Sequence, residues 1–430
     1  MPLLKKRESL ETTNARASVV IRELLGGGSQ GEVYIVSIDG KNYALKWYFP
    51  EYATPQQSIN LKNLVEIGAP SNRFLWPLDV VETKGLGYVM PLCEERFKNM
   101  NDLMKNKIDP SFRALCTAGY ELAHNFLLLH TKGLAYEDIS ANNVLIDPKT
   151  GEIRICDNDN VVFDGTRSSQ VLGTPRFMSP EIIRGEAMPS ADSDLFSLSV
   201  LLFYILMLSH PLEGRKEAEI HCFNLQAMKK IYGDEPVFIF DPNDESNRPV
   251  EGIHNNALIY WNLYPEFIRK LFTRAFTIGL REPRERVAES EWRKSFIELR
   301  DSITYCPRCG AENFFDPTAR KVPNCWNCGN NIELPIRIKI GEVEIIANND
   351  TELYPHHLDS DRLYDFSEVV AKVSHHPNKP HLLGLTNLSQ QKWVAALPDG
   401  KMIEIPRGKN VSLLPGIKIH FGTSIGEVVR

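Results

Sequence analysis

The chain has few of the features that mark membrane, secreted or nucleic-acid-binding proteins. Its strongest apolar run, residues 200–208, is nine residues long, and a helix needs ~20 apolar residues to span a bilayer. Residues 1–18 are polar and have no apolar core, so they predict a flexible leader rather than a signal peptide. The formal net charge of −6 over 430 residues gives no support to nucleic-acid binding as the main role. We therefore expect neither a membrane nor a nucleic acid as a partner.

Cysteine is scarce and unevenly placed, with eight residues in all. Four are scattered along the chain: Cys93, Cys116, Cys156 and Cys222. The other four form two C-x-x-C pairs separated by fifteen residues: Cys306, Cys309, Cys325 and Cys328. A single C-x-x-C could be a redox dithiol, but two pairs at this spacing favour a tetrahedral site for a structural Zn²⁺. Reduced thiols and a metal site predict a cytoplasmic protein.

A glycine-rich loop lies near the start of the chain, at residues 26–31. A dinucleotide-binding turn is one alternative, but such a turn opens a helix. Here the β-branched segment 33–38 follows, then an Asp-Gly turn, and then the segment 41–46. That pattern predicts two antiparallel strands with a lid for phosphates at one end. The predicted phosphate contacts are Gly26, Gly27, Gly28, Ser29, Gln30 and Gly31.

Three polar residues suggest phosphoryl-transfer chemistry. Asp138 precedes Asn143 by five positions, and Asp157 follows Asp138 by nineteen, after the apolar segment 153–155. Phosphoryl transfer needs one group to orient and deprotonate a hydroxyl and others to hold a metal ion. Alone, an Asp and an Asn in a turn more often form local turn hydrogen bonds.

Further segments in the same order resemble eukaryotic-type protein kinases. Residues 44–46, Ala-Leu-Lys, are similar to the V-A-I-K strand, and residues 173–181 to the G-T-x-x-Y-M-x-P-E segment. Small-molecule phosphotransferases lack that second segment. The resemblance implies that Lys46 holds the ATP phosphates, Asp138 is the general base, and Asn143 and Asp157 bind Mg²⁺. It places the adenine among Val33, Ala44, Met90, Pro91, Leu92, Cys93 and Leu145. It also implies three structural residues: Asp194, which holds the catalytic loop, and a buried Glu181–Arg286 pair.

Four departures from the kinase pattern bear on activity. The helix position that normally carries a glutamate for the lysine falls near Asn60, and Gln56 or Gln57 could only hydrogen-bond Lys46. Tyr-Glu at 136–137 replaces His-Arg, so the loop is of the non-RD type, and activation should not need a phosphate within residues 161–176. Ser140 replaces a phosphate-binding lysine, as in RIO kinases, and Asn-Asp at 158–159 replaces Phe-Gly.

The last hundred residues predict a β-sandwich. Short β-rich runs alternate with Gly, Pro, Asn and Asp turns. The later runs resemble a forkhead-associated domain, which implies phosphothreonine binding through Ser367 and Asn387. Val370 stands at the usual histidine position, and no arginine fits the motif. The alternative is a sandwich that docks on the kinase or on another protein.

These observations predict an α+β, bilobal kinase-like fold followed by a zinc ribbon and an all-β sandwich. The expected borders are a leader at 1–18, a kinase domain at 19–300 with lobes at 19–91 and 92–300, a ribbon at 301–333 and the sandwich at 334–430. The arrangement is similar to bacterial kinases grouped with a von Willebrand-A protein and a phosphatase in tellurite-resistance-type systems. It implies partner proteins for the β-module and a cognate phosphatase.

The expected activity is ATP- and Mg²⁺-dependent phosphorylation of serine and threonine in proteins, the chain itself included. The alternative is a nucleotide-binding pseudokinase that acts as a scaffold.

Overall fold

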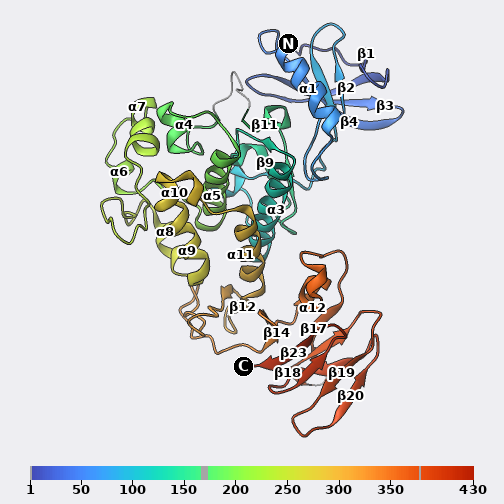
Figure 1. Cartoon of the computed structure of the whole chain (residues 1–430), viewed down its shortest axis with the longest axis vertical. Helices are drawn as coiled ribbons and strands as arrows, with labels where there is room; N and C mark the ends of the chain where they lie inside the picture. The colour runs from blue at the N-terminus through green and yellow to red at the C-terminus, as the bar shows by residue number, and fades with distance from the viewer. Residues whose placement is uncertain (1, 166–172, 377–378) are drawn as a thin grey trace. The chain divides into compact units, whose positions relative to one another are not determined.

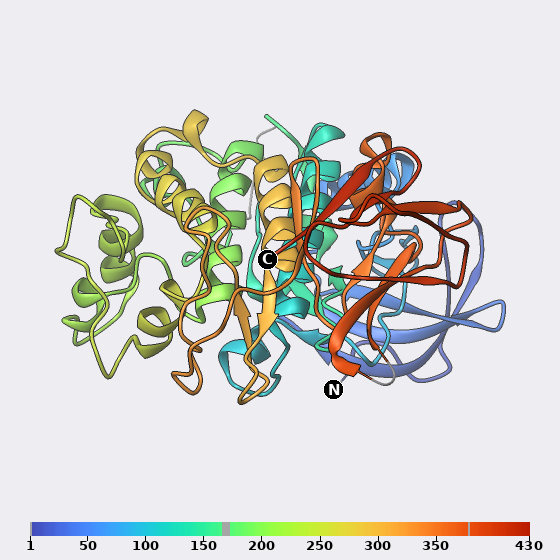
Figure 2. The same ribbon diagram turned by 90° about the horizontal axis from the view of Figure 1, so that it is seen from below.

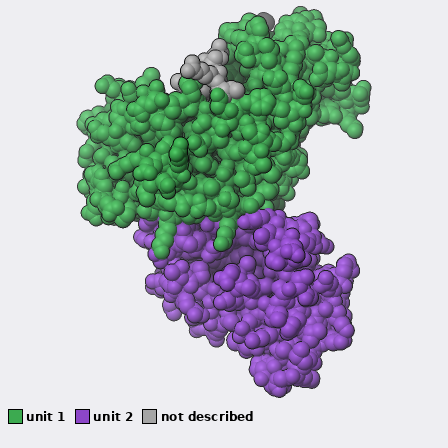
Figure 3. Space-filling view, viewed as in Figure 1, with its two compact units in different colours: residues 1–258, 270–294 green, residues 259–269, 295–430 purple. Residues whose placement is uncertain are grey.

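The structure, a computed structural model, describes residues 2–165, 173–376 and 379–430. It divides into two compact units (Figure 3). Unit 1 comprises residues 1–258 and 270–294, and unit 2 comprises residues 259–269 and 295–430. These borders differ from the domain borders expected from the sequence, because residues 259–269 group with the C-terminal part. Across the described ranges, no helix is both long enough and apolar enough to cross a membrane.

The N-terminal lobe of unit 1 is a six-stranded antiparallel sheet with one helix (Figure 1). Its strand order is β1-β2-β3-β4-β6-β5. The strands are β1 (Ser9–Glu11), β2 (Ser18–Gly27), β3 (Gly31–Ile38), β4 (Lys41–Tyr48), β5 (Asp79–Val81) and β6 (Gly87–Met90). Helix α1 (Pro55–Ile67) begins after Thr54, whose side chain accepts a hydrogen bond from the Gln57 amide. It buries Leu61 and Leu64, and Leu61 belongs to an apolar cluster that contains residues of β4 and β6.

The predicted flexible leader is wrong for residues 9–11, which form β1. This strand pairs with β2, with Leu10 opposite Val19. The side chains of Leu4 and Leu10 are buried in the core that lies under the sheet. The carboxylate of Asp79 accepts hydrogen bonds from the amides of Asn14 and Ala15, at 3.1 and 2.9 Å. Long-range packing therefore orders a segment whose own sequence is polar.

The C-terminal lobe of unit 1 is mainly helical and is organised around α5 (Ala191–Met207). Most of the apolar run at 200–208 is buried in this helix, which explains its composition. Phe203 makes edge-to-face contacts with Phe272 and Phe276, with ring centroids 5.2 and 5.7 Å apart. The other helices of four or more residues between β6 and β12 are α2 (Asn101–Met104), α3 (Phe112–Thr131), α4 (Pro180–Arg184), α6 (Arg215–Ala218), α7 (Leu225–Met228), the π-helical turn Lys229–Asp234, α8 (Asn255–Trp261), α9 (Glu266–Ala275), α10 (Ile278–Arg281) and α11 (Glu289–Asp301). Residues 259–261 of α8, 266–269 of α9 and 295–301 of α11 belong to unit 2.

Short strands in this lobe carry the loops of the site. Strands β7 (Lys98–Asn99), β9 (Val144–Ile146) and β10 (Ile153–Ile155) form one small sheet. Strands β8 (Leu134–Ala135) and β11 (Val162–Phe163) form another. The β9–β10 hairpin therefore fixes the distance between the loop before β9 and the loop after β10.

Unit 2 contains a β-hairpin and a two-sheet sandwich (Figure 2). The hairpin is β12 (Ile303–Tyr305) with β13 (Glu312–Phe314). The sandwich sheets have the orders β15-β14-β23-β22-β19-β20 and β16-β17-β18-β21. Their strands are β14 (Arg337–Ile340), β15 (Val343–Ile346), β16 (Glu352–Leu353), β17 (Ala371–His376), β18 (Lys379–Asn387), β19 (Trp393–Ala396), β20 (Met402–Ile405), β21 (Asn410–Ser412), β22 (Lys418–His420) and β23 (Ile425–Val429), and helix α12 (Pro355–Leu358) lies between β16 and β17.

The cysteine-rich segment and the sandwich share buried contacts within unit 2. Ile346 of β15 belongs to the same apolar cluster as Cys306 and Cys325. The guanidinium of Arg337 lies 4.6 Å from the centroid of the Phe315 ring. The cysteine-rich segment and the strands β14 and β15 thus pack together rather than lying on two ends of a free linker.

Candidate functional site

The glycine-rich loop connects β2 to β3, as the sequence predicts. Gly26 pairs with Val33 across the two strands, and the Gly28 amide donates to the Gly31 carbonyl at 2.8 Å. Gly31 must lack a side chain, because a Cβ there would lie 2.2 Å from the carbonyl oxygen of Trp47. Gly26, Gly27, Gly28 and Ser29 are exposed at the tip, where they can close over phosphates.

The residues expected around the adenine lie in one apolar cluster. Ala44 and Met90 are buried in it, and the partly buried side chains packed against it include Val33, Leu92, Cys93 and Leu145. Pro91 is half-buried between Met90 and Leu92. The sequence missed Cys156, a member of the same cluster that directly precedes Asp157.

The carboxylate of Asp138 is held by two residues from opposite sides. Thr174 donates to its Oδ1 twice, from the backbone amide and from the hydroxyl, each at 2.8 Å. The side-chain amide of Asn143 donates to its Oδ2 at 3.0 Å. Since these hydrogen bonds use the nitrogen of Asn143, the carbonyl oxygen of that side chain remains the atom suited to a hard cation.

Burial raises the pKa of Asp138, and the nearby charge of Asp157 raises it further. Hydrogen bonds from Thr174 and Asn143 act in the opposite direction and lower it. A raised pKa makes a carboxylate a stronger proton acceptor. Asp157 lies at the end of the β10 strand in the left-handed region, with φ of 52°. Such a conformation is unusual for a residue other than glycine and is concentrated at functional sites.

The catalytic loop is anchored to α5 through Asp194. Its carboxylate accepts hydrogen bonds from the backbone amides of Tyr136 and Glu137, at 2.6 and 3.2 Å. The Glu181 carboxylate accepts two bonds from Arg286, at 2.8 and 2.9 Å, and this pair ties the segment after Thr174 to the end of the lobe.

Lys46 is buried and makes its shortest contacts with a residue that the sequence analysis did not select. Its Nζ lies 2.9 and 2.8 Å from the two carboxylate oxygens of Asp159, and 3.3 Å from Asp157. Gln30 of the glycine loop accepts a longer bond of 3.4 Å. Burial would lower the pKa of Lys46, but the two carboxylates outweigh it and the pKa is raised.

The expectation that an amide of α1 orients Lys46 is wrong. Asn60 donates instead to the backbone carbonyls of Asp159 and Val161, both at 3.2 Å. Gln57 donates to the Tyr48 hydroxyl at 3.0 Å and to the Asp159 carbonyl at 3.4 Å. Gln56 is exposed. The helix therefore binds the backbone of the loop after β10 (residues 156–161) rather than the lysine.

The structure also places two other residues, Ser140 and Glu137, at which the sequence departs from the kinase pattern. Ser140 is completely buried, so its hydroxyl is not accessible to solvent in this form. Glu137 is also buried and adopts a left-handed backbone, with φ of 66°. Part of the segment in which no activating phosphate is expected, residues 166–172, lies outside the described residues.

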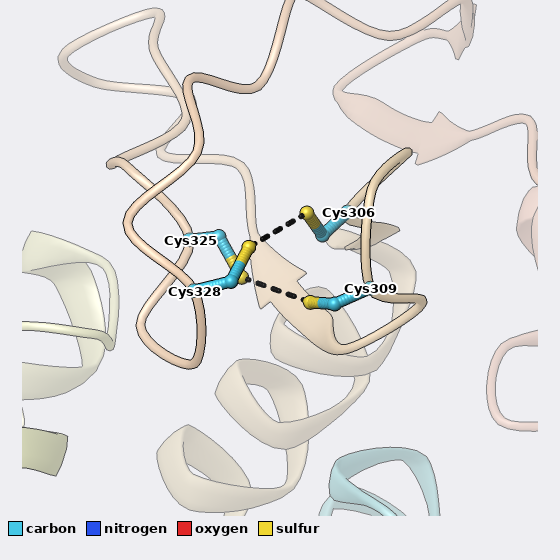
Figure 4. Close-up of side chains that lie close together, drawn as sticks. All are labelled: Cys306, Cys309, Cys325 and Cys328. Atoms are coloured by element: carbon cyan, nitrogen blue, oxygen red, sulfur yellow. Dashed lines mark hydrogen bonds between the residues drawn. The ribbon is translucent and has the colours of Figure 1, made fainter.

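The four clustered cysteines converge at one point of unit 2 (Figure 4). Their sulfur atoms all lie within 4.8 Å of one another, with Cys306 3.7 Å from Cys328 and Cys309 3.6 Å from Cys325. A tetrahedron of four thiolates around Zn²⁺, with Zn–S of about 2.3 Å, requires S···S distances near 3.8 Å. Gly310 and Gly329 follow the two pairs with φ of 75° and 69°, the turn conformation expected there. The residues present therefore fit a zinc ion.

Of the two predicted phosphothreonine contacts, Asn387 uses its side chain for hydrogen bonds within the domain, whereas Ser367 is exposed. Asn387 is fully buried, and its amide nitrogen donates to the carbonyls of Gln391 and Ile405. Its side-chain oxygen accepts from the amide and the hydroxyl of Ser389. Because an asparagine side chain has two donors and two acceptor positions, no capacity remains for a phosphate. Asn387 holds the loop after β18; Ser367 lies in a different loop, where its amide donates to Asp365.

Comparison with known proteins agrees with this geometry. A family model described as "Protein kinase domain" matches residues 19–298. Protein kinase C delta type of Rattus norvegicus is 31% identical over 213 residues, which cover 46% of this chain and 30% of that protein. Protein kinase MCK1 of Saccharomyces cerevisiae is 25% identical over 250 residues, covering 55% of this chain and 63% of that protein. The chain thus matches less than two thirds of the length of these relatives.

Proposed function

Since the chain belongs to the protein kinase family, we propose that it transfers the γ-phosphoryl group of ATP to serine and threonine hydroxyls of proteins, itself included. The observation that carries this proposal is the set of contacts around Asp138. A carboxylate with a raised pKa is held by Thr174 and Asn143. It lies in a site that also contains Lys46 and Asp157, which are 3.3 Å apart.

The chain's own residues divide the work of the reaction. The glycine loop covers the phosphates, and Lys46 holds them as a point charge. Asp138 orients the substrate hydroxyl and accepts its proton while the new O–P bond forms and the bond to the leaving oxygen of ADP breaks. Mg²⁺, when bound, neutralises charge on the phosphates; the Asn143 oxygen and Asp157, whose side chain is 46% exposed, are the hard ligands that would hold it.

The experiment is paired measurement of phosphoryl transfer from radiolabelled ATP and of Mg²⁺-ATP affinity by calorimetry. Asp138→Asn should keep the affinity within a few-fold and lose transfer by orders of magnitude, because the base acts only near the transition state. Asp157→Ala should weaken Mg²⁺-dependent binding and abolish transfer. Asp399→Asn, a change in a surface turn of the sandwich, serves as the control. A wild type that binds Mg²⁺-ATP but phosphorylates neither itself nor a broad peptide library would instead favour the pseudokinase alternative.

We further propose that unit 2 holds one structural Zn²⁺ and that its sandwich, which is forkhead-associated-like in sequence, recruits partner proteins. The converging sulfur atoms support the metal, and a two-sheet sandwich is compatible with a docking module. The full use of the Asn387 side chain within the domain argues against phosphothreonine binding through that residue. The proposed localisation is cytoplasmic, and a cognate phosphatase remains part of the proposal from the sequence.

A further inference from the structure

We propose that Asp159, the third residue of the metal loop, is the carboxylate that positions Lys46 for nucleotide binding, in place of a glutamate from α1. This inference rests on the proposed function. Protein kinases normally pair this lysine with a glutamate of the helix. The only carboxylate of α1, Glu66, lies exposed at its C-terminal end. Through Asp159, the loop after β10 supplies the carboxylate that α1 does not place near Lys46.

The contacts of Asp159 account for its whole hydrogen-bonding capacity. Oδ1 accepts from Lys46 at 2.9 Å and from the Tyr88 hydroxyl at 2.9 Å. Oδ2 accepts from Lys46 at 2.8 Å and from the Tyr48 hydroxyl. A carboxylate offers about four acceptor positions, and all are used. Asp159 therefore cannot serve as a second ligand for a metal ion in this arrangement.

Burial separates the roles of the two acidic residues in this loop. The Asp159 side chain is 1% exposed, whereas that of Asp157 is 46% exposed. Both carboxylate oxygens of Asp159 contact the Lys46 ammonium, whereas Asp157 contacts it through one oxygen at 3.3 Å. Asp159 therefore fixes the position of Lys46, and Asp157 remains accessible to a metal and phosphates.

Helix α1 contributes to the arrangement indirectly. The side-chain amides of Asn60 and Gln57 both donate to the backbone carbonyl of Asp159. Amides rather than acids suit this task, because a carbonyl needs a donor and a carboxylate would repel it. The lysine is therefore hydrogen-bonded to the same loop that carries Asp157, the proposed metal ligand.

The test moves the carboxylate from position 159 in the loop to position 60 in α1 and measures Mg²⁺-ATP affinity by calorimetry. Thermal unfolding checks that each variant is folded. Asp159→Gly installs the residue that kinases usually have there and should weaken affinity about 10- to 100-fold, the loss typical for a charged hydrogen-bonding partner. Asn60→Glu added to Asp159→Gly should recover most of the affinity and of phosphoryl transfer. Asn63→Glu, at an exposed position of the same helix, is the matched control and should recover neither.

The outcomes are distinct. Unchanged affinity in folded Asp159→Gly, or equal behaviour of the Asn60→Glu and Asn63→Glu double variants, would overturn the proposal. If Asp159→Gly does not fold, Asp159→Asn replaces it, and normal affinity in that variant would overturn the proposal equally. A wild type that binds Mg²⁺-ATP without transferring phosphate would contradict the kinase activity alone, because the affinity comparison would still decide the role of Asp159.

Discussion

Thr174 contacts the same oxygen of Asp138 through two different groups, and these contributions can be separated by substitution. The backbone amide bond persists whatever the side chain, whereas the hydroxyl bond at 2.8 Å depends on it. The hydroxyl restrains the carboxylate at the position from which it can accept a proton. Thr174 is therefore a positioning residue.

Thr174→Val should lower kcat by about tenfold or more, because a hydrogen bond to a charged group contributes roughly 1.5–3 kcal/mol. The KM for ATP should change little, since Thr174 touches the base and not the phosphates. Steady-state kinetics of autophosphorylation or peptide phosphorylation would measure both. Thr174→Ser keeps the hydroxyl and should stay close to wild type; an equal loss in both variants would show that the methyl group and its packing matter instead.

Local motifs selected residues that the structure brings together, but they did not select Asp159, which contacts Lys46. Asp138, Asn143, Asp157 and Lys46 stand in short segments whose spacing reflects local loop geometry. Asp159 is 113 residues from Lys46, and no local pattern joins them. A signal was present: an acid occupies the usual glycine position at 159, and α1 lacks one near residue 60. Only the fold shows that these two departures compensate each other.

At the scale of elements, His130 joins three helices of unit 1. It lies in the last turn of α3, with Nε2 3.1 Å from Asp194 of α5 and Nδ1 in contact with Glu289 of α11. Both ring nitrogens can donate only when the imidazole is protonated. Burial would lower the pKa of His130, but hydrogen bonds to the two carboxylates outweigh it and raise the pKa to about 9.

The stabilising effect of His130 should therefore depend on pH. Because the pKa of His130 in the folded state lies above its unfolded value of about 6.5, the protonated imidazole contributes its full stabilisation of the fold below pH of about 6.5. This contribution to the free energy of unfolding is lost as the pH rises through about 9. The unfolding free energy of wild type should exceed that of His130→Gln most at pH 6 and progressively less toward pH 10. Denaturant titrations over this range would measure the difference.

His124, in the same helix, is the matched control with the opposite sign. Burial and the charge of Arg293 lower its pKa, so its neutral form stabilises the fold and this contribution is lost as pH falls below about 6.5. The difference between wild type and His124→Gln should then shrink at acidic pH. Parallel curves for the two substitutions would contradict the assignment of His130 as a charged link.

The sequence predicted long elements better than short ones. The two strands expected at 33–38 and 41–46 span Gly31–Ile38 and Lys41–Tyr48, because a β-branched pattern over several residues is a local property. Strand β1 is three residues long and forms only because β2 offers its edge. The π-helical turn Lys229–Asp234 likewise has no sequence signature, and it packs against α4, where Arg184 donates to the Gly233 carbonyl at 2.8 Å.

At the scale of the whole molecule, the cysteine cluster should determine whether unit 2 keeps its structure. Cys306 and Cys325 are buried with Phe315 and Ile346 in one apolar cluster, so loss of a metal would disturb both the ribbon and the adjoining strand. Small metal-dependent segments generally derive their folding free energy from the metal.

Elemental analysis of the full chain should give about one zinc per molecule, and Cys325→Ser should reduce it. A strong chelator should lower the melting temperature of the calorimetric transition that belongs to unit 2. The fluorescence of Trp326 gives a second readout of metal loss, because its indole donates a hydrogen bond to the Glu312 carbonyl at 2.8 Å within the cysteine-rich segment. Cys222→Ser, which removes an exposed cysteine outside the cluster, should change none of these. Full zinc occupancy in Cys325→Ser would refute a four-cysteine site.

The division of the chain into two compact units could not be predicted from motifs. Motifs mark where a segment begins, but compactness depends on which side chains meet in space. In unit 2, Tyr264 packs on Phe314 with ring centroids 5.0 Å apart, and Tyr260 lies 5.9 Å from Trp326. The Glu266 amide donates to Asp316 at 3.1 Å. These contacts place residues 259–269 with the ribbon although they precede the expected border at residue 300.

That grouping limits how the C-terminal region could be exchanged between related proteins during evolution. A recombination event near residue 300 would attach a new ribbon to the old residues 259–269 and leave Tyr260 and Tyr264 without the rings of Trp326 and Phe314. An inherited exchange must therefore bring a ribbon with matching aromatic residues, or carry the segment 259–269 along with it. We expect these four rings to change together across the family, even though they are far apart in the sequence.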